Sequence, residues 1–281
     1  MSLRGEAAII GIGELPTTRA TPGRSMIGLM GDVGRIAIHD AHIRFEDVDG
    51  LVTEGGLVYP GFASEYLGIR PRFASGASMM GASGATGVTL ASMAVQNGLA
   101  NYVLVVIATA RNPNIPAAGG GPPSMRSEIE EPYGMSAGAN TGYGMMYVRH
   151  MEEYGTTEEQ MAHMAVNERF NTLENPNSVF QGQPITHEDV MNSRYVNYPI
   201  KLLETVMPCA GAAAVVVTSA ERAKHSLNRP VYVLGAGVAT DPLMGWQRDK
   251  LTETPVARSA PTAFTMSGYT PRDMQFAQFY D

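Results

Sequence analysis

Two uninterrupted apolar runs constrain the fold of this chain more than any other feature. They are "YVLVVIATA" (102–110) and "GAAAVVVTSAERAK" (211–224), the second of which leads into a helical stretch. A strand without polar alternation is typical of a sheet that is covered on both faces. Further strands are expected at 7–13, 49–56 and 72–76, and helices at 25–41 and 84–98. This order of elements predicts an α/β fold with helices on both sides of a sheet.

Capping signals predict where several helices begin and end. Ser25 is a suitable N-cap, and Asn97-Gly98 is typical of a helix C-terminus. In the middle of the chain, Thr156 and Glu159 match a capping box, and Thr186 is expected to cap the next helix. The final stretch, "TPRDMQFAQFYD", is also compatible with a helix.

The chain contains a repeat. "VYVLGAGVATDP" (231–242) has the form of "AAIIGIGELPTT" (7–18), an apolar strand followed by Gly-x-Gly and a polar or proline turn. Two strand starts of one design predict two α/β halves built on one plan. Neither copy has the third glycine of a dinucleotide-binding fingerprint, so the sequence disfavours NAD binding.

Composition narrows the function classes. The net charge of −7 and the absence of a basic stripe argue against nucleic-acid binding as the main role. A single cysteine, Cys209, excludes an internal disulfide and a thiolate metal cluster, and it favours the cytoplasm. No apolar stretch has the roughly 18 residues that a membrane span needs. We expect neither a metal nor a resident cofactor.

The motifs along the chain resemble those of one family. "EYG", "NPNSVF" and "VMNSR" within 152–196, the strand "GAAAVVVTSAERAK", and "VQNGLANYVLVVIATAR" (95–111) stand in the order found in sterol-carrier-protein-type thiolases. The resemblance implies a thiolase-like fold with duplicated βαβαβαββ halves, the C-terminal half truncated. It implies three parts: an N-terminal half (1–110 and 205–228), a loop domain inserted in it (111–204), and the start of a C-terminal half (229–281).

The resemblance also locates the position of the family's nucleophile. Aligning the helix end "LASMAVQNGLA" places Gly81 where these thiolases carry a cysteine. Without that thiolate no acyl-enzyme can form there. Ser78 and Ser83 lie close to Gly81 in the sequence. Each is a candidate either for a nucleophile or for a hydroxyl that stabilises the turn. The expected oxyanion- and substrate-binding residues are Met80, Gly81, Ala82, Ser83 and Gly84, which precede or begin a helix, together with Tyr143, which could line an acyl pocket or pack under the loop.

The end of the chain resembles the family's "HDCF" motif. Tyr280 stands at the position of its histidine and Asp281 at that of its aspartate. Steroid side-chain aldolases, a branch of this family, lack the cysteine and carry tyrosine at this position. They cleave a β-hydroxyacyl-CoA by a retro-aldol reaction. Tyr280 is therefore a candidate base, with Asp281 as its orienting group.

Two functions follow from this resemblance. The first is an enzyme that handles acyl-CoA thioesters, by aldol-type C–C cleavage or by acyl transfer, in lipid or steroid side-chain breakdown. The alternative is a catalytically inactive thiolase-like fragment or binding subunit. The family implies a homodimer formed through the strand near "RFASG" (72–76) and a small partner protein with an OB-fold and a zinc ribbon.

Overall fold

The computed structural model describes residues 2–54, 59–112, 139–241 and 248–279. The chain forms two compact units. The first comprises Met1–Arg111, Cys209–Ala239 and Val256–Asp281, and the second comprises Asn112–Pro208 and Thr240–Pro255. Each unit is described separately below.

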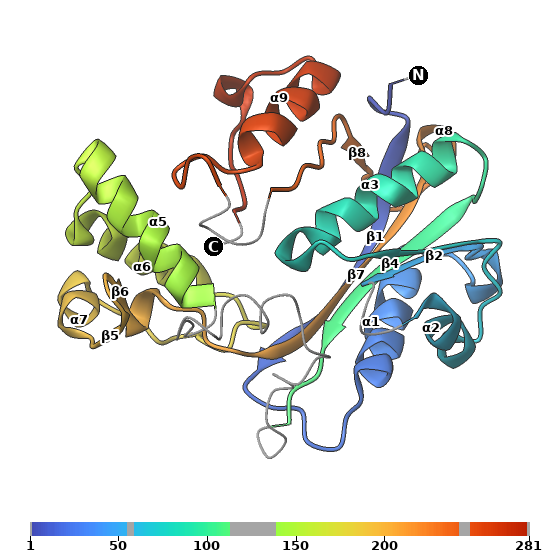
Figure 1. The fold of residues 1–281 in the computed structure, drawn as a ribbon. Helices are drawn as coiled ribbons and strands as arrows, with labels where there is room; N and C mark the ends of the chain where they lie inside the picture. The colour runs from blue at the N-terminus through green and yellow to red at the C-terminus, as the bar shows by residue number, and fades with distance from the viewer. Residues whose placement is uncertain (1, 55–58, 113–138, 242–247, 280–281) are drawn as a thin grey trace. The chain divides into compact units, whose positions relative to one another are not determined.

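The first unit is built on a six-stranded mixed sheet (Figure 1) in the order β3-β2-β4-β7-β1-β8. Strands β3, β2 and β4 are parallel to one another, and β7 runs antiparallel to both β4 and β1. Edge strand β8 pairs antiparallel with β1. The bounds are β1 Ala7–Thr18, β2 Gly50–Glu54, β3 Phe73–Ala77, β4 Tyr102–Thr109, β7 Ala210–Ser219 and β8 Val231–Val233.

Helices cover both faces of this sheet, as the apolar runs predict. Helices α1 (Met26–Asp40) and α2 (Pro60–Leu67) lie on one face, and α3 (Ser83–Gln96) lies on the other (Figure 1). Alternate residues of β2 enter different cores, because Leu51 packs with α1 while Val52 packs with α3. The short helix α8 (Ala220–Ala223) follows β7 directly.

Most helix ends in this unit lie where the local signals predict them. The Ser25 side chain accepts a hydrogen bond from Gly28 N at the start of α1. Helix α3 ends at Gln96, with Asn97 as its C-cap and Gly98 at a φ of 69°. The first strand is longer than expected, since pairing with β7 carries β1 beyond Gly13 to Thr18.

Both copies of the Gly-x-Gly repeat pack against the backbone of a helix. A Cβ atom added to Gly11 or Gly13 would lie 2.5 Å from the carbonyl oxygen of Ala37 or Val33, respectively, in α1. In the second copy, Gly235 and Gly237 approach the carbonyl oxygens of Ala263 and Ser259 even more closely. In each copy, two glycines two residues apart face two carbonyls four residues apart, one helical turn. The repeat seen in the sequence is thus a repeat in packing.

Helix α9 (Val256–Ser267), which the second glycine pair contacts, was not predicted from the sequence. The helix-compatible stretch 270–281 instead begins with a single 3-10 turn, η6 (Pro271–Asp273), and continues without regular structure through its described part. Gly268, at a φ of 73°, ends α9, and the Asp273 carboxylate accepts hydrogen bonds from Thr270. These local hydrogen bonds stabilise a turn in a stretch whose sequence is also compatible with a helix.

The second unit consists mainly of helices. Its elements are α5 Ala139–Tyr154, α6 Glu158–Thr172, α7 His187–Asn192, the two-stranded sheet of β5 Tyr195–Asn197 and β6 Ile200–Lys201, and the 3-10 turn η4 Leu202–Glu204. Thr186 caps α7 as predicted.

The capping box of α6 lies one residue beyond the predicted one. It uses Thr157 and Gln160, because the side chain of Thr156 is engaged elsewhere by His150 Nδ1 at 2.6 Å.

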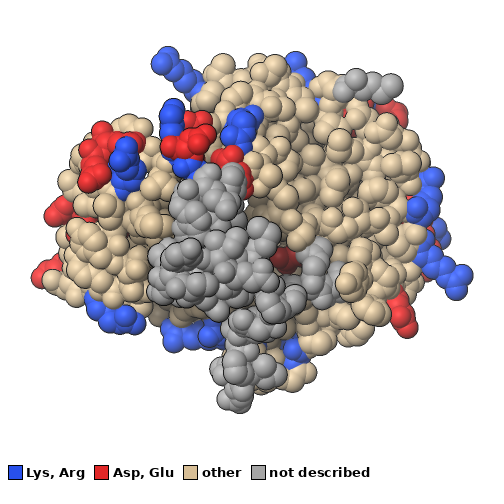
Figure 2. Space-filling model, viewed as in Figure 1, with Lys and Arg blue, Asp and Glu red and all other residues tan. Residues whose placement is uncertain are grey.

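The surface carries charges of both signs. Figure 2 shows Lys and Arg interspersed with Asp and Glu on the visible face, and the residues drawn in colour form no continuous basic area there. Among the described helices, none combines the length and apolar character that a membrane span requires.

Candidate active site at the start of α3

The turn between β3 and α3 brings the predicted oxyanion residues together. Met80, Gly81 and Ala82 form the 3-10 turn η2, and α3 begins at Ser83. Gly81 and Ala82 are exposed, and Met80 has 71% of its surface exposed. Met80 also adopts a φ of 50°, in the left-handed region that non-glycine residues seldom occupy. The backbone of this turn is therefore held in a specific and costly conformation.

Ser83 holds this turn in place. Its side chain is buried, accepts a hydrogen bond from Met79 N at 3.0 Å and donates one to Met80 O at 2.7 Å. Of the two roles that the sequence left open for this serine, the geometry matches a turn hydroxyl.

The start of α3 is a candidate for binding an oxygen anion. Its N-cap residue is Ala82, and no side chain from the described residues caps it. Two of its backbone donors are used inside the turn, since Ala82 N donates to Met79 O at 3.0 Å and Ser83 N donates to Met80 O. N–H groups in the first turn of a helix point outward and carry partial positive charge. A thioester oxygen that becomes negative in a transition state is stabilised by such donors. The sequence-predicted set Met80 to Gly84 forms one local structure, the turn η2 and the first residues of α3.

The sequence analysis missed a carboxylate near this turn, that of Glu54 at the end of β2. Glu54 is the register partner of Ala77, the last residue of β3. Ligands in α/β folds commonly bind at the carboxyl ends of parallel strands. Burial raises the pKa of Glu54 above its ordinary value. The available signal was the single acidic residue that closes the apolar run "GLVTE".

The remaining predicted residues are not part of this turn. Tyr143 lies on α5 in the second unit and is half exposed. Tyr280 and Asp281, the candidate base and its orienting group, lie outside the described residues.

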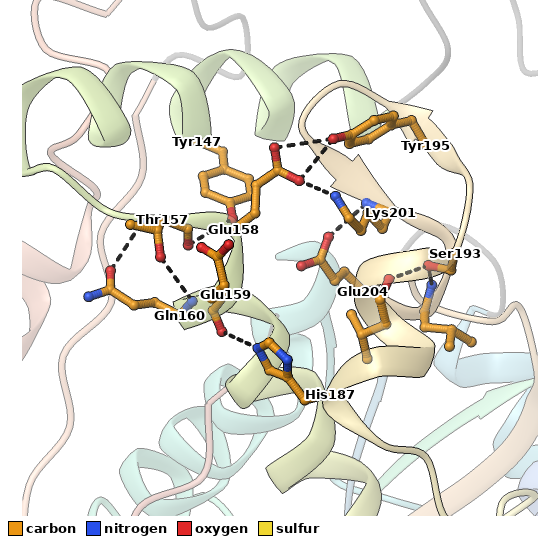
Figure 3. A network of polar contacts seen from close by, with 12 residues as sticks. Tyr147, Thr157, Glu158, Glu159, Gln160, His187, Ser193, Tyr195, Lys201 and Glu204 are labelled. Carbon is orange, nitrogen blue, oxygen red and sulfur yellow. Dashed lines mark hydrogen bonds and ion pairs between the residues drawn. The ribbon is translucent and has the colours of Figure 1, made fainter.

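The second unit contains a polar network that the sequence also did not reveal (Figure 3). The Lys201 side chain, 3% exposed, pairs with Glu158 and lies 4.1 Å from the centre of the Tyr195 ring. Tyr195 donates its hydroxyl to the same carboxylate at 2.9 Å. Since each partner of the buried ammonium comes from another element, the network joins α6 to the β5–β6 sheet.

Two further groups of this network have shifted pKa values. Burial raises the pKa of Glu204, whose Oε2 accepts from Lys201 N at 2.7 Å while its Oε1 has no hydrogen-bond partner among the described residues. Burial, with the nearby charges of Glu204 and Glu158, raises the pKa of Tyr147. Tyr147 donates to Thr157 O at 3.4 Å. These contacts are internal to the unit, so we assign the network a structural role.

An open cavity of about 420 Å³ lies along α5 in the same unit. Its lining is largely apolar and includes Met145, Val148, Tyr198 and Leu251. Tyr143 is not among the residues that line it. Within the described parts of the chain, no group of three or more His, Cys, Asp or Glu residues is placed to hold a metal ion.

Comparison with known proteins shows which proteins this chain is related to. No family model matches the chain. The chain is 30% identical over 299 residues to the 17-hydroxy-3-oxo-4-pregnene-20-carboxyl-CoA lyase of Mycobacterium tuberculosis, covering 99% of this chain and 76% of that protein. It is 31% identical over 294 residues to the steroid side-chain-cleaving aldolase of Thermomonospora curvata, covering 99% and 75%.

Solved structures agree with these relatives. The structure of the Ltp2-ChsH2(DUF35) aldolase superposes with a TM-score of 0.89 at 30% identity, covering 97% of this chain and 72% of that one. A monomeric SCP2-thiolase-like protein from Mycobacterium smegmatis shares the fold, with a TM-score of 0.76 at 18% identity over 96% of this chain and 58% of that one. The chain therefore belongs to the thiolase superfamily, among the sterol-carrier-protein-type thiolase-like proteins that include steroid side-chain aldolases.

Proposed function

We propose that this protein is a lyase that cleaves a C–C bond of a β-hydroxyacyl-CoA by a retro-aldol reaction in steroid or lipid side-chain breakdown. The observation that carries the proposal is the turn before α3. It presents an exposed glycine, Gly81, and a helix start without a side-chain cap, at the position where the family resemblance places the nucleophile of thiolases. The names of the two curated relatives, a lyase and an aldolase, support the same class of reaction.

The proposed chemistry needs two functions from the protein. A base takes the proton of the β-hydroxyl while the bond between the α- and β-carbons breaks, and donors stabilise the thioester enolate that remains. The proposed donors are backbone N–H groups at the start of α3 other than those of Ala82 and Ser83, which donate to Met79 O and Met80 O. Tyr280 is the proposed base, and Asp281 orients it, which is supported by the resemblance of the chain end to the family motif. Met80 and Tyr143 are proposed to contact the substrate.

The proposed assembly has two further components. A small OB-fold and zinc-ribbon protein acts with the chain, supported by the similar aldolase structure whose name joins two components. Two copies of the chain pair through β3, supported by the position of β3 at the edge of the sheet. The proposed reaction uses the coenzyme A thioester as its substrate and invokes no resident cofactor.

Product analysis tests the proposed reaction. Purified protein is incubated with a β-hydroxyacyl-CoA that carries a steroid-derived side chain, with and without a co-purified partner. We expect a ketone or aldehyde and a shortened acyl-CoA in equal amounts by mass spectrometry. Tight binding of the substrate without either product, in the presence of the partner, would instead support the binding-subunit alternative.

A variant of the turn tests the site itself. Gly81→Leu places a large side chain at the exposed position before α3, so we expect loss of cleavage. Gly61→Leu is the control, because a Cβ atom at Gly61 meets no atom within 4 Å. Equal cleavage by both variants would remove the turn from the proposed mechanism. Tyr280→Phe tests the base in the same assay, and unchanged cleavage would exclude it.

A further inference from the structure

We infer that Glu54 is the proton donor that completes the reaction, by protonating the α-carbon of the thioester enolate. This inference rests on the proposed function and deepens it, since it assigns the second proton transfer to a residue of the same site. Three observations carry it: the face of the sheet on which Glu54 lies, its distance along that face from the start of α3, and the absence of competing ionisable groups from the surrounding elements.

Glu54 lies on the face of the sheet that α3 covers. Residues of a strand alternate between faces, and Val52 belongs to the core beneath α3. Glu54, two residues further along β2, is therefore on the same face. The helix covers β2 because α3 connects β3 to β4, the two strands on either side of β2.

Glu54 is also level with the first turn of α3. A Cβ atom added to Gly87 would lie 2.7 Å from Val105 Cγ1 of β4 and 3.5 Å from Val52 Cγ1 of β2, so this part of the helix lies over both strands. Gly84, one turn earlier, lies in the same way over Ile107 of β4, with 3.5 Å between its added Cβ atom and Ile107 Cδ1. Moving from Val52 to Glu54 covers about 6.6 Å along the strand, and moving from Gly87 to Gly84 covers about 4.5 Å along the helix toward the same end. Glu54 and the start of α3 therefore lie at the same level on the same face of the sheet, near the turn that is proposed to bind the thioester oxygen.

The elements around Glu54 contain no other charged group. Strands β2, β3 and β7, the turn η2 and helix α3 hold no further Asp, Glu, Lys, Arg or His, and β4 adds only Tyr102 at its opposite end. The next ionisable residue after β4 is Arg111, four residues beyond the position level with Glu54. No hydrogen bond to the Glu54 side chain is found among the described residues. Glu54 is thus the one acid that these elements offer at this place.

The environment of Glu54 disfavours its charged form. The side chain is half-buried, and burial raises the pKa of the carboxyl group above its ordinary value. In the reaction, the electrons of the broken C–C bond pass to the thioester enolate. The protonated Glu54 then gives its proton to the α-carbon, a C–H bond forms, and a carboxylate remains. Water, or the base that took the hydroxyl proton, returns a proton to it.

Hydrogen exchange at the α-carbon tests this role without requiring cleavage. In D₂O, the Glu54 carboxylate removes an α-proton from a short acyl-CoA such as propionyl-CoA, and a deuteron is returned to the enolate. We expect the protein to speed this exchange, measured by NMR, and Glu54→Gln to slow it at least about 100-fold. Glu65→Gln makes the same change on α2, on the other face of the sheet, and should keep the wild-type rate.

The outcomes separate this inference from the proposed function. Exchange in Glu54→Gln at the wild-type rate overturns the role of Glu54, and so does cleavage by a wild-type protein that shows no exchange. Wild-type exchange without cleavage of any β-hydroxyacyl-CoA would contradict the proposed function while supporting Glu54. Gln has almost the same shape as Glu, so both glutamine variants should melt at the same temperature. Equal melting temperatures then show that a loss of exchange comes from the lost carboxyl group and not from unfolding.

Discussion

Ser83 and Met79 close the turn before α3 by a hydrogen bond of 3.0 Å from the Met79 backbone N–H to the Ser83 hydroxyl. The same hydroxyl donates to Met80 O. One buried side chain therefore fixes both sides of the turn in which Gly81 lies.

Ser83→Ala should loosen this turn. The variant leaves the Met79 N–H without its partner, so we expect a loss of about 1–3 kcal/mol in the free energy of unfolding and slower cleavage. Chemical denaturation measures the first effect, and the product assay measures the second. Ser92→Ala, which removes a hydroxyl bonded only within the same helix to Val88 O, should cost less and leave cleavage unchanged.

Asp49→Asn should weaken the start of the parallel strands at neutral pH. Burial would raise the pKa of Asp49, but hydrogen bonds from Tyr102 N, Asn101 N and Arg72 lower it overall. A carboxyl group with a lowered folded-state pKa stabilises the protein above its unfolded-state value of about 3.9. That contribution is lost as the pH falls through the folded-state pKa.

The stability difference between wild type and Asp49→Asn should therefore be about 2 kcal/mol at pH 7 and shrink below pH 4. Urea unfolding at the two pH values measures it. A difference that stays constant between pH 7 and pH 3 would show that the charge of Asp49 is not what stabilises this region.

Lys201→Met should destabilise the second unit through the charge that it leaves behind. The Glu158 carboxylate would keep its hydrogen bond from Tyr195 and lose its counter-ion, at a cost of about 3 kcal/mol. The double variant Lys201→Met with Glu158→Gln removes both charges and should recover most of that loss. A double-mutant cycle from thermal unfolding measures the coupling, and additive losses would contradict it.

Gly237→Ala should be more harmful than an ordinary glycine substitution. The added methyl group would meet the Ser259 carbonyl, so α9 or the backbone around Gly237 must move, and we expect a loss of more than about 2 kcal/mol. Gly61→Ala, in open space near the start of α2, should be neutral or slightly stabilising. Equal melting temperatures for the two variants would contradict the close packing of α9.

Ala74→Arg should disturb the proposed pairing of two chains. Ala74 is exposed in the middle of the edge strand β3, and a long charged side chain there obstructs a second strand. Sedimentation should show a dimer for the wild type and a monomer for the variant, with unchanged circular dichroism. A wild-type monomer at all concentrations would exclude the dimer.

Local patterns predicted the parts of this fold that depend on nearby residues. Ser25 and Thr186 cap their helices because each satisfies a backbone N–H three residues away. The apolar run 102–110 gave a central strand because a sheet covered on both faces excludes polar side chains. Family resemblance, rather than any local pattern, identified Gly81.

The missed features depend on partners that are distant in the sequence. Helix α9 contains Pro261 and packs on Gly235 and Gly237, so its own sequence is a weak guide. Lys201 is buried because Glu158 lies 43 residues earlier in the chain but beside it in space. Glu54 lies within the predicted strand 49–56. Its position near the start of α3 depends on how the helix packs on the sheet, which the local sequence does not show.

The two glycine pairs have a consequence for how such motifs are interpreted in genomes. A Gly-x-Gly that cradles a phosphate must turn N–H donors toward empty space. Here helix carbonyl oxygens lie within 2.5 Å of the position that a Cβ atom would take at Gly11, Gly13, Gly235 or Gly237, and their partial negative charge repels an anion. Nucleotide searches that score the glycines alone will therefore report false sites in proteins of this architecture, and scoring the helix that faces them would remove the error.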